Sequence, residues 1–466
     1  MDKVQETRKT GPARGVMAGL ALTTLLGALG ISGANIALPD IAADLGASFA
    51  GAQWVTIAYL LSVTTLVVGA GQLGDRFGHR RVLGGGIALF SLASVVCAAA
   101  PTLPVLVAAR AAQGAGAAAM MALTVALARD TAPEGKAGRA IGILGSMSAV
   151  GTALGPALGG LLIGAAGWRA VFVVLMAAGV VAMLTVRRFL PATGTARQVP
   201  SFDRAGMAVL ALTLGAYAMA LTLDDARGAL RAALLLLAVA GGALFLRVEA
   251  RAERPMIAPA ALRDPVMAAG LAMNAVVAAV MMATLVVGPF VLSRGLGLDP
   301  GHVGAVMAVG PVLAALSGLP AGRTVDRFGA ARMAVAGIAL MAAGSMAFAV
   351  LPGIAGVGGY VAAMAILTPG YQLFLAANTT AIMADAGPDR KGTVSGLLNL
   401  SRNLGLITGA AAMGALFALA VGTPDIGAAR PEAVVQGLAV TFATATACLA
   451  GAIVLATTGA LRPREA

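Results

Sequence analysis

The stretch Gly71-Gln-Leu-Gly-Asp-Arg-Phe-Gly-His-Arg-Arg81 decides the fold, because the chain contains it twice. Residues 322–332 read Gly-Arg-Thr-Val-Asp-Arg-Phe-Gly-Ala-Ala-Arg. The two stretches share the first glycine, the Asp-Arg-Phe-Gly run and the last arginine, which makes six matches at one offset of 251 residues. Self-similarity at a fixed offset is the signature of an internal repeat. The sequence therefore predicts two related halves, each with a tight turn that needs glycine.

Long apolar runs surround both copies of this loop. Hydrophobic residues make up 59% of the 466 residues, charged residues 11%, and the mean hydropathy is +0.91. A soluble domain is about one quarter charged. Runs of about twenty apolar residues can cross a hydrocarbon core about 30 Å thick, and they lack the alternation of barrel strands. We therefore expect an all-α integral membrane protein with fourteen transmembrane helices.

The expected spans lie near residues 16–38, 52–73, 82–100, 104–127, 139–164, 169–187, 205–222, 229–247, 266–293, 303–323, 331–350, 355–384, 394–420 and 434–458. We predict an N-terminal six-helix half at residues 1–188 and a C-terminal six-helix half at residues 265–466. Residues 189–264 would hold two linkers and an inserted hairpin of spans 7 and 8. The linker at 247–264 could contain a short surface helix or be a solvated hinge.

The net charge of +12 comes from the distribution of Lys and Arg over the two faces of the membrane. With both termini cytoplasmic, 25 of the 32 basic residues fall on the inside, five on the outside and two, Arg110 and Arg402, within spans. This asymmetry is the positive-inside rule. It predicts a multi-pass protein of the bacterial inner membrane and argues against a nucleic-acid partner.

Two further motifs lie inside predicted spans. Arg110 opens the run Arg-Ala-Ala-Gln-Gly-Ala-Gly in span 4, where an arginine is costly unless it is paired or faces water. Span 5 contains Gly-Thr-Ala-Leu-Gly-Pro-Ala-Leu-Gly-Gly at residues 151–160. Its proline bends the helix, and its glycines allow a neighbouring helix to approach closely.

Together, these stretches resemble the fourteen-helix drug:proton antiporters of the major facilitator superfamily, a group that includes quaternary-ammonium and methylenomycin-type resistance exporters. The resemblance covers essentially the whole chain and implies a proton-coupled exporter with rocker-switch alternating access. It implicates these residues in proton coupling and gating: Gly71, Asp75, Arg76, Gly78, Arg81, Arg110, Asp326 and Arg327. It identifies the antiporter motif of exporters in Gly151, Gly155, Pro156, Gly159 and Gly160. The open alternatives are loop arginines that only anchor topology, an Arg110 capped by backbone carbonyls, and a purely structural kink.

The chain departs from that family in the membrane-embedded acids. Gly30 stands where related transporters carry an acid, and Leu175 stands where they carry Asn. None of the twenty Asp and Glu lies in the middle third of a predicted span. A lipophilic dication needs a buried carboxylate to offset desolvation. We therefore expect neutral or weakly anionic cargo and proton coupling through the Asp75 cluster and Arg110.

Sparse polar side chains would line the substrate cavity, although any of them could instead form an interhelical hydrogen bond. The candidates are Asn35, Tyr59, Gln113, Asn274, Gln372, Asn378 and Arg402. A metabolite facilitator or importer is the alternative within transporters. A membrane enzyme is disfavoured, because the two histidines, His79 and His302, lie on opposite faces. We expect no cofactor and no metal, with a small hydrophobic substrate, protons and the lipid bilayer as partners of a monomer.

Overall fold

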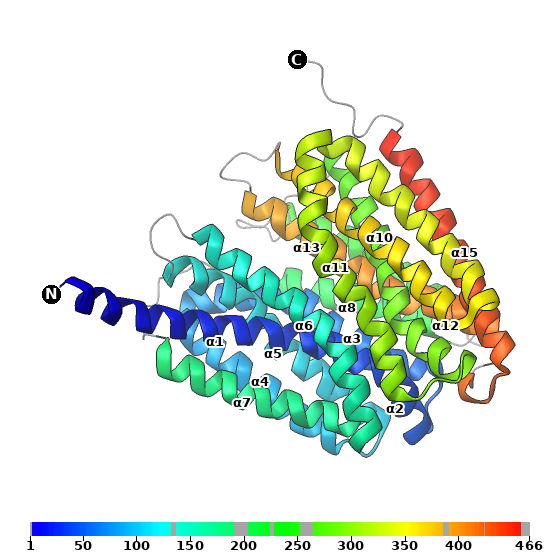
Figure 1. Ribbon diagram of the computed structural model, residues 1–466, viewed down its shortest axis with the longest axis horizontal. Helices are drawn as coiled ribbons and strands as arrows, with labels where there is room; N and C mark the ends of the chain where they lie inside the picture. Colours follow the sequence, from blue (N-terminus) through cyan, green and yellow to red (C-terminus); the bar gives the residue numbers. More distant parts are fainter. Residues whose placement is uncertain are drawn as a thin grey trace. The chain divides into compact units, whose positions relative to one another are not determined.

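The structure, a computed structural model, describes residues 2–131, 137–190, 204–223, 228–251, 264–384, 391–423 and 425–457. Its described residues are helical, without a β-strand, and thirteen of the helices are long and apolar enough to cross a membrane. They form two compact units (Figure 1). The first comprises residues 1–37 and 54–211, and the second comprises residues 38–53 and 212–466. The all-helical fold class predicted from the apolar runs is thus confirmed.

The first unit is a bundle of long helices. Its members are α1 (Asp2–Ile36), most of α3 (Phe49–Phe77), α4 (His79–Ala99), α5 (Leu103–Thr131), α6 (Ala137–Ala166), α7 (Arg169–Phe189) and the start of α8 (Arg204–Thr222). Helix α1 packs against α5, α6 and α7, and α4 packs against α5 and α7. Figure 1 shows α4, in cyan-blue, beside the green α7.

The second unit contains the remaining helices. They are α2 (Leu38–Asp44), the end of α8, α9 (Gly228–Glu249), α10 (Pro265–Phe290), α11 (Pro300–Phe328), α12 (Ala330–Ala384), α13 (Lys391–Thr408), α14 (Gly414–Val421) and α15 (Pro431–Leu455). A π-helical turn, Val291–Gly295, extends α10, and another, Gly409–Met413, joins α13 to α14. Helix α10 packs against α13 and α15, and α12 packs against α11 and α15.

The repeated loop adopts the same structure in both units. Helix α3 runs from residue 49 to 77 and α11 from 300 to 328, so both ends differ by 251 residues. The turn after each helix is made by a glycine with positive φ, 94° at Gly78 and 87° at Gly329. Side chains other than glycine rarely adopt this backbone conformation. Each copy of the sequence therefore produces a helix of equal length and an equivalent turn.

Helix α12 covers the region of two expected spans. It has 55 residues, and its backbone is non-helical at Gly356, with φ 53° and ψ −128°. Two helices therefore meet at Gly356, and their 55 residues, at about 1.5 Å each, are together more than twice as long as a hydrocarbon core of about 30 Å is thick. The break expected at residues 351–354 lies in helix, and the bend falls at Gly356 instead.

Helices α8 and α9 correspond to the expected hairpin. A Cβ built on Gly241 of α9 would lie 3.2 Å from Thr213 Cβ of α8, so the two helices touch within the second unit. Glu249 ends α9 and is 1% exposed, whereas the sequence placed it in a solvated linker. The sequence left a short surface helix or a solvated hinge open for the linker at residues 247–264, and residues 252–263 of it lie outside the described residues. The domain boundaries at residues 188 and 264 stay predictions.

Candidate functional site

Arg110 is a fully buried charge at the centre of the first unit. Its Nε donates to the Val55 carbonyl of α3 at 2.8 Å, and its Nη1 donates to the Gly30 carbonyl of α1 at 2.9 Å. Nη1 also contacts the Gln113 amide oxygen on the next turn of α5. Arg110 thus joins three helices through backbone carbonyls. These contacts are those of the alternative in which Arg110 is a structural arginine.

Aromatic rings enclose the guanidinium. Its carbon lies 4.3 Å from the ring centre of Tyr59 and 5.9 Å from that of Phe172, which are cation–π distances. Tyr59 in turn donates its hydroxyl to the Gly27 carbonyl at 3.1 Å. Within the described residues, Arg110 Nη2 is buried and has no hydrogen-bond partner. The cage therefore holds the charge through carbonyl and amide oxygens and aromatic rings, and it leaves the two N–H donors of Nη2 unused.

Gln113 connects this cage to α4. Its Nε2 donates to Ser94 Oγ at 2.7 Å, and Ser94 Oγ donates to the Phe90 carbonyl at 2.7 Å. Gln113 and Ser94 are both 0% exposed. The sequence gives no indication of this role for Ser94, other than that it is a polar residue within an apolar run. Its role depends on the register between α4 and α5.

The packing around Gly30 explains why this position holds no acidic side chain. A Cβ built there would lie 3.0 Å from the Tyr59 hydroxyl and 3.1 Å from Phe90 Cε2. Both contacts are tighter than ordinary van der Waals contact. The space for an acidic side chain is thus occupied by the rings that enclose Arg110, whose counter-group at this position is the Gly30 carbonyl.

The glycines of the 151–160 motif bring α6 against α1. A Cβ on Gly151 would lie 2.6 Å from the Leu25 carbonyl oxygen, and one on Gly159 would lie 2.6 Å from Ile36 Cγ2. A Cβ on Gly155 would overlap Ser32 Oγ and lie 2.9 Å from the Gly33 nitrogen. The structure therefore brings these glycines together on one face, where two helix backbones meet. Pro156 and Gly160 of the motif are also buried.

The two copies of the repeated loop share an arginine–phenylalanine contact, and they differ in a contact between an aspartate and a histidine. In both copies an arginine lies over the ring of the next phenylalanine, Arg76 over Phe77 at 5.4 Å and Arg327 over Phe328 at 5.1 Å. Asp75 Oδ1 lies 2.9 Å from His79 Nε2, and 54% of the Asp75 side chain is exposed.

Ala330 occupies the position of His79 in the second copy, and Asp326 is exposed there. Gly71 and Gly322, which open the two loops, have free space around them. Among the described residues, this carboxylate–imidazole pair therefore occurs in the first copy of the loop and not in the second.

Most of the predicted cavity residues are bound to neighbouring helices. Asn274 Nδ2 donates to the Leu398 carbonyl at 3.0 Å, and Asn378 Nδ2 donates to the Gly270 carbonyl at 3.1 Å. Gln372 Nε2 donates to the Ala314 carbonyl at 3.1 Å. In the first unit, Asn35 Oδ1 accepts from Thr56 Oγ1 at 2.5 Å. These contacts match the alternative of interhelical hydrogen bonds.

Arg402 differs from the other predicted cavity residues. It is exposed on α13, and within the described residues no carboxylate lies within 4.0 Å of it. The buried Gln53 was not predicted, although it is a polar residue in an apolar run; its Nε2 donates to the Ala410 carbonyl at 2.8 Å.

Charged residues also lie near α2 and the end of α10 in the second unit. Arg294 and Asp425 line a pocket of about 50 Å³ beside α2. Burial raises the pKa of the Asp40 carboxyl above its ordinary value of 3.8, an effect that the charge of Arg294 partly offsets. Asp299 contacts His302, and this hydrogen bond lowers the pKa of the Asp299 carboxyl. Asp40 is the half-buried carboxylate of this end.

The chain is a multi-pass membrane protein. It consists of two helical units that share a repeated loop, and its buried polar groups form hydrogen bonds between helices. The chain belongs to the Major Facilitator Superfamily, whose profile matches residues 20–410. Members of this family are transporters rather than enzymes.

The chain is 32% identical over 399 residues to an uncharacterized transporter of Escherichia coli (strain K12), YebQ, covering 85% of this chain and 86% of the relative. It is 28% identical to the riboflavin transporter RibZ of Clostridioides difficile (strain 630), covering 86% of each chain. It is 30% identical to the tetracenomycin C resistance and export protein of Streptomyces glaucescens, covering 86% of this chain and 76% of the relative.

The fold is shared with a bacterial homolog of the human lysosomal transporter Spinster in an inward-facing, unoccupied conformation. The TM-score is 0.72 with 18% sequence identity, over 96% of each chain. At this identity the likeness establishes the fold alone.

Proposed function

We propose that this protein is a proton-coupled exporter of small hydrophobic compounds that works by alternating access of its two halves. The observation that carries this proposal is the α1–α6 contact, in which Gly151, Gly155 and Gly159 lie directly on the α1 backbone. The motif that makes this contact resembles the antiporter signature of exporters. A relative named as a tetracenomycin C resistance and export protein supports the same direction of transport.

The cargo is proposed to be neutral or weakly anionic. Among the described residues, the only buried charged side chains are Arg110 and Glu249, and Glu249 is the last residue of its helix. A multivalent cation would have to leave water without a carboxylate in the membrane interior, which is costly. A neutral or weakly anionic compound avoids the penalty of an unpaired cation, and Arg402 is an exposed donor on α13.

Proton coupling is proposed to involve the Asp75–His79 pair together with Arg110. A carboxylate and an imidazole in hydrogen-bond contact can accept and release a proton at the cytoplasmic loop. The absence of this histidine from the second copy supports a function specific to the first.

We further propose fourteen spans in the bacterial inner membrane, with both termini cytoplasmic. Helix α12 would count as two spans that meet at Gly356, because 55 helical residues exceed one crossing. The pair α8 and α9 would lie beside the two halves as the inserted hairpin, and the monomer would be the functional unit.

The test is transport into everted membrane vesicles with neutral, anionic and cationic compounds. We expect energised vesicles to accumulate neutral or weakly anionic compounds and to lose them when an uncoupler is added. Asp75→Asn should remove the pH-driven component, and the matched Asp326→Asn should retain more of it. Full pH-driven uptake by Asp75→Asn would refute the coupling route.

A facilitator of a small metabolite is the second candidate, because one relative is a riboflavin transporter. It predicts equilibration that the uncoupler does not change, and that result would replace the exporter proposal. Strong accumulation of a dication would refute the proposed cargo class while leaving export intact.

A further inference from the structure

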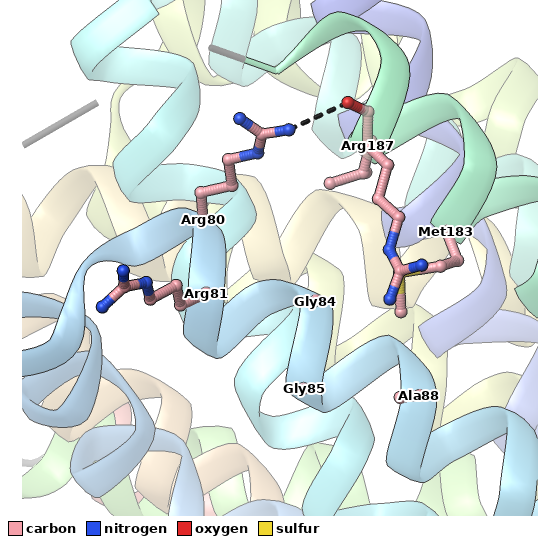
Figure 2. A pocket seen from close by; sticks show the side chains of 8 residues that line it. Arg80, Arg81, Gly84, Gly85, Ala88, Met183 and Arg187 are labelled. Carbon is pink, nitrogen blue, oxygen red and sulfur yellow. Dashed lines mark hydrogen bonds between the residues drawn. The ribbon is translucent and has the colours of Figure 1, made fainter. Parts of the chain in front are cut away.

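A groove of about 610 Å³ lies between α4 and α7, entirely within the first unit. Figure 2 shows its side chains from both helices. It is lined by Arg80, Arg81, Gly84, Gly85, Ala88, Met183, Val186 and Arg187. Three of these eight residues are arginines, all near the start of α4 or the end of α7. None of the transport steps proposed above uses this groove.

Among the described residues, the three arginines have no carboxylate as a counter-ion. Arg80 Nη2 donates to the Arg187 carbonyl at 2.9 Å, the contact drawn in Figure 2. In the part of the chain that the structure describes, no carboxylate lies within 4.0 Å of any of the three guanidinium groups. A guanidinium presents five donors in a planar fork, which suits a phosphate. Like charges at one groove repel one another, and an anion bound there would offset that repulsion.

The floor of the groove is open because of two glycines. A Cβ built on Gly84 or Gly85 would meet no atom within 4 Å, whereas one on Gly86 would lie 2.7 Å from Ala119 Cβ. Packing between helices thus explains Gly86 but not its two neighbours. Each glycine inside a helix costs about 1 kcal/mol relative to alanine. What these two residues provide is space between α4 and α7.

The second half of the chain has larger residues at the positions of the two open glycines. At the offset of 251 residues, Gly84 corresponds to Val335 and Gly85 to Ala336, while Arg80 corresponds to Ala331. Arg81 is retained as Arg332. At these positions the second half therefore carries one arginine fewer and larger side chains in place of the two glycines.

Below the arginines, the groove becomes apolar. Ala88 and Met183 line it, and the faces continue with Leu92 on α4 and Leu184 on α7. Leu92 is 65% exposed and Leu184 is 61% exposed, at helical spacing from the groove residues of each helix. Exposed leucines in a membrane-spanning helix face acyl chains. A ligand that fits the whole surface carries an anionic head and an apolar tail.

We propose that this groove binds the phosphate headgroup of an anionic phospholipid of the cytoplasmic leaflet, with its acyl chains on α4 and α7. The proposal rests on the orientation proposed above, in which the arginines lie at the cytoplasmic boundary. That leaflet is rich in anionic lipid and attracts basic groups near its surface. A lipid held there would bridge the same two helices that Arg80 connects. The apolar continuation favours a lipid over a soluble phosphate.

The test is native mass spectrometry of the purified full-length chain in detergent, titrated with phosphatidylglycerol, phosphatidylcholine or inorganic phosphate. We expect phosphatidylglycerol to bind at least about tenfold more tightly than phosphatidylcholine. Neutralising Arg80, Arg81 and Arg187 to Gln should weaken phosphatidylglycerol binding by about fivefold per arginine, or about 100-fold together. Because transport is not measured, failure of the exporter proposal would leave this result unaffected.

Two matched variants separate a site from general attraction. Gly84→Val with Gly85→Ala copies the second half and fills the groove while keeping every charge, so we expect it also to lose phosphatidylglycerol binding. The control neutralises Arg323, Arg327 and Arg332 to Gln, which removes three exposed arginines from the equivalent loop. An equal loss in this control, or equal binding of the two lipids, would overturn the proposal. Binding of inorganic phosphate alone with equal affinity would assign the groove to a soluble anion instead.

Discussion

Replacing Gly155 by alanine tests the contact on which the exporter proposal depends. The added methyl group would overlap Ser32 Oγ and lie 2.9 Å from the Gly33 nitrogen of α1. The nitrogen cannot move out of the way by a side-chain rotation, because it belongs to a helix backbone. Helices α1 and α6 would therefore have to separate by about half an ångström or more to restore ordinary contact.

Two terms of opposite sign set the size of the effect. Overpacking a well-packed interface costs about 1–3 kcal/mol, and a Gly→Ala change in a helix returns about 1 kcal/mol. Since the clash is with backbone, we expect the upper part of the first range and a net loss of about 1–2 kcal/mol. At about 2–4 °C per kcal/mol, the melting temperature should fall by about 2–8 °C.

The assay is thermal unfolding of the purified protein in detergent, followed by the fluorescence of its two tryptophans. Gly145→Ala is the control, because Gly145 lies in the same helix and a Cβ there would meet nothing within 4 Å. Its melting temperature should stay equal or rise. If Gly155→Ala melts as high as the wild type, or if both variants fall together, the close α1–α6 contact is not what stabilises the first unit.

Three further predictions concern other positions. Arg110→Lys exchanges a planar guanidinium, which donates to two backbone carbonyls, for one ammonium group. It should therefore lower the free energy of unfolding by about 1–3 kcal/mol in the same melting assay. An unchanged melting temperature would show that the carbonyl contacts contribute nothing. Asp40→Asn should raise the melting temperature more at pH 7 than at pH 4. The pKa of the Asp40 carboxyl is raised in the folded chain, so the folded chain binds this proton more tightly than the unfolded chain does. The wild type therefore loses stability as the pH rises above 3.8, the ordinary pKa of the carboxyl. Equal differences at the two pH values would contradict this. Gly356→Ala should destabilise the protein by about 1–3 kcal/mol because its φ of 53° disfavours other side chains, whereas Gly358→Ala, with open space around it, should not; similar melting of these two variants would exclude strain at the bend.

The parts of the fold that depend on local pattern could be predicted from the sequence. The repeated loop specifies a helix end and a glycine turn within about ten residues, and both copies form them at Gly78 and Gly329. Apolar runs specify helices in the same local way. Helix α12 shows the limit of this reasoning. The expected spans 331–350 and 355–384 placed the break at residues 351–354, yet the backbone stays helical until Gly356.

The partners of buried polar groups could not be predicted, because those partners are carbonyls of other helices. Every helix presents the same carbonyl groups, so the sequence does not distinguish Val55 or Gly30 from their neighbours as acceptors for Arg110. The register between packed helices decides the matter. The same is true of Asn274 and Asn378, which look like cavity residues in the sequence and bind helix backbones in the structure.

Differences between the two copies of the repeat are more informative about function than the matches. The matched residues form the turn and its arginine–phenylalanine stack, and they recur because both halves need the same helix connection. The unmatched residues of the first copy make contacts that the second copy lacks. These contacts are His79 on Asp75 and Arg80 on the Arg187 carbonyl, and just beyond them the first half has open space at glycines 84 and 85. Since duplicated halves share one architecture, a requirement of the fold would act on both copies. A feature present in one copy alone therefore reflects a task given to that half, and here those features cluster at the start of α4.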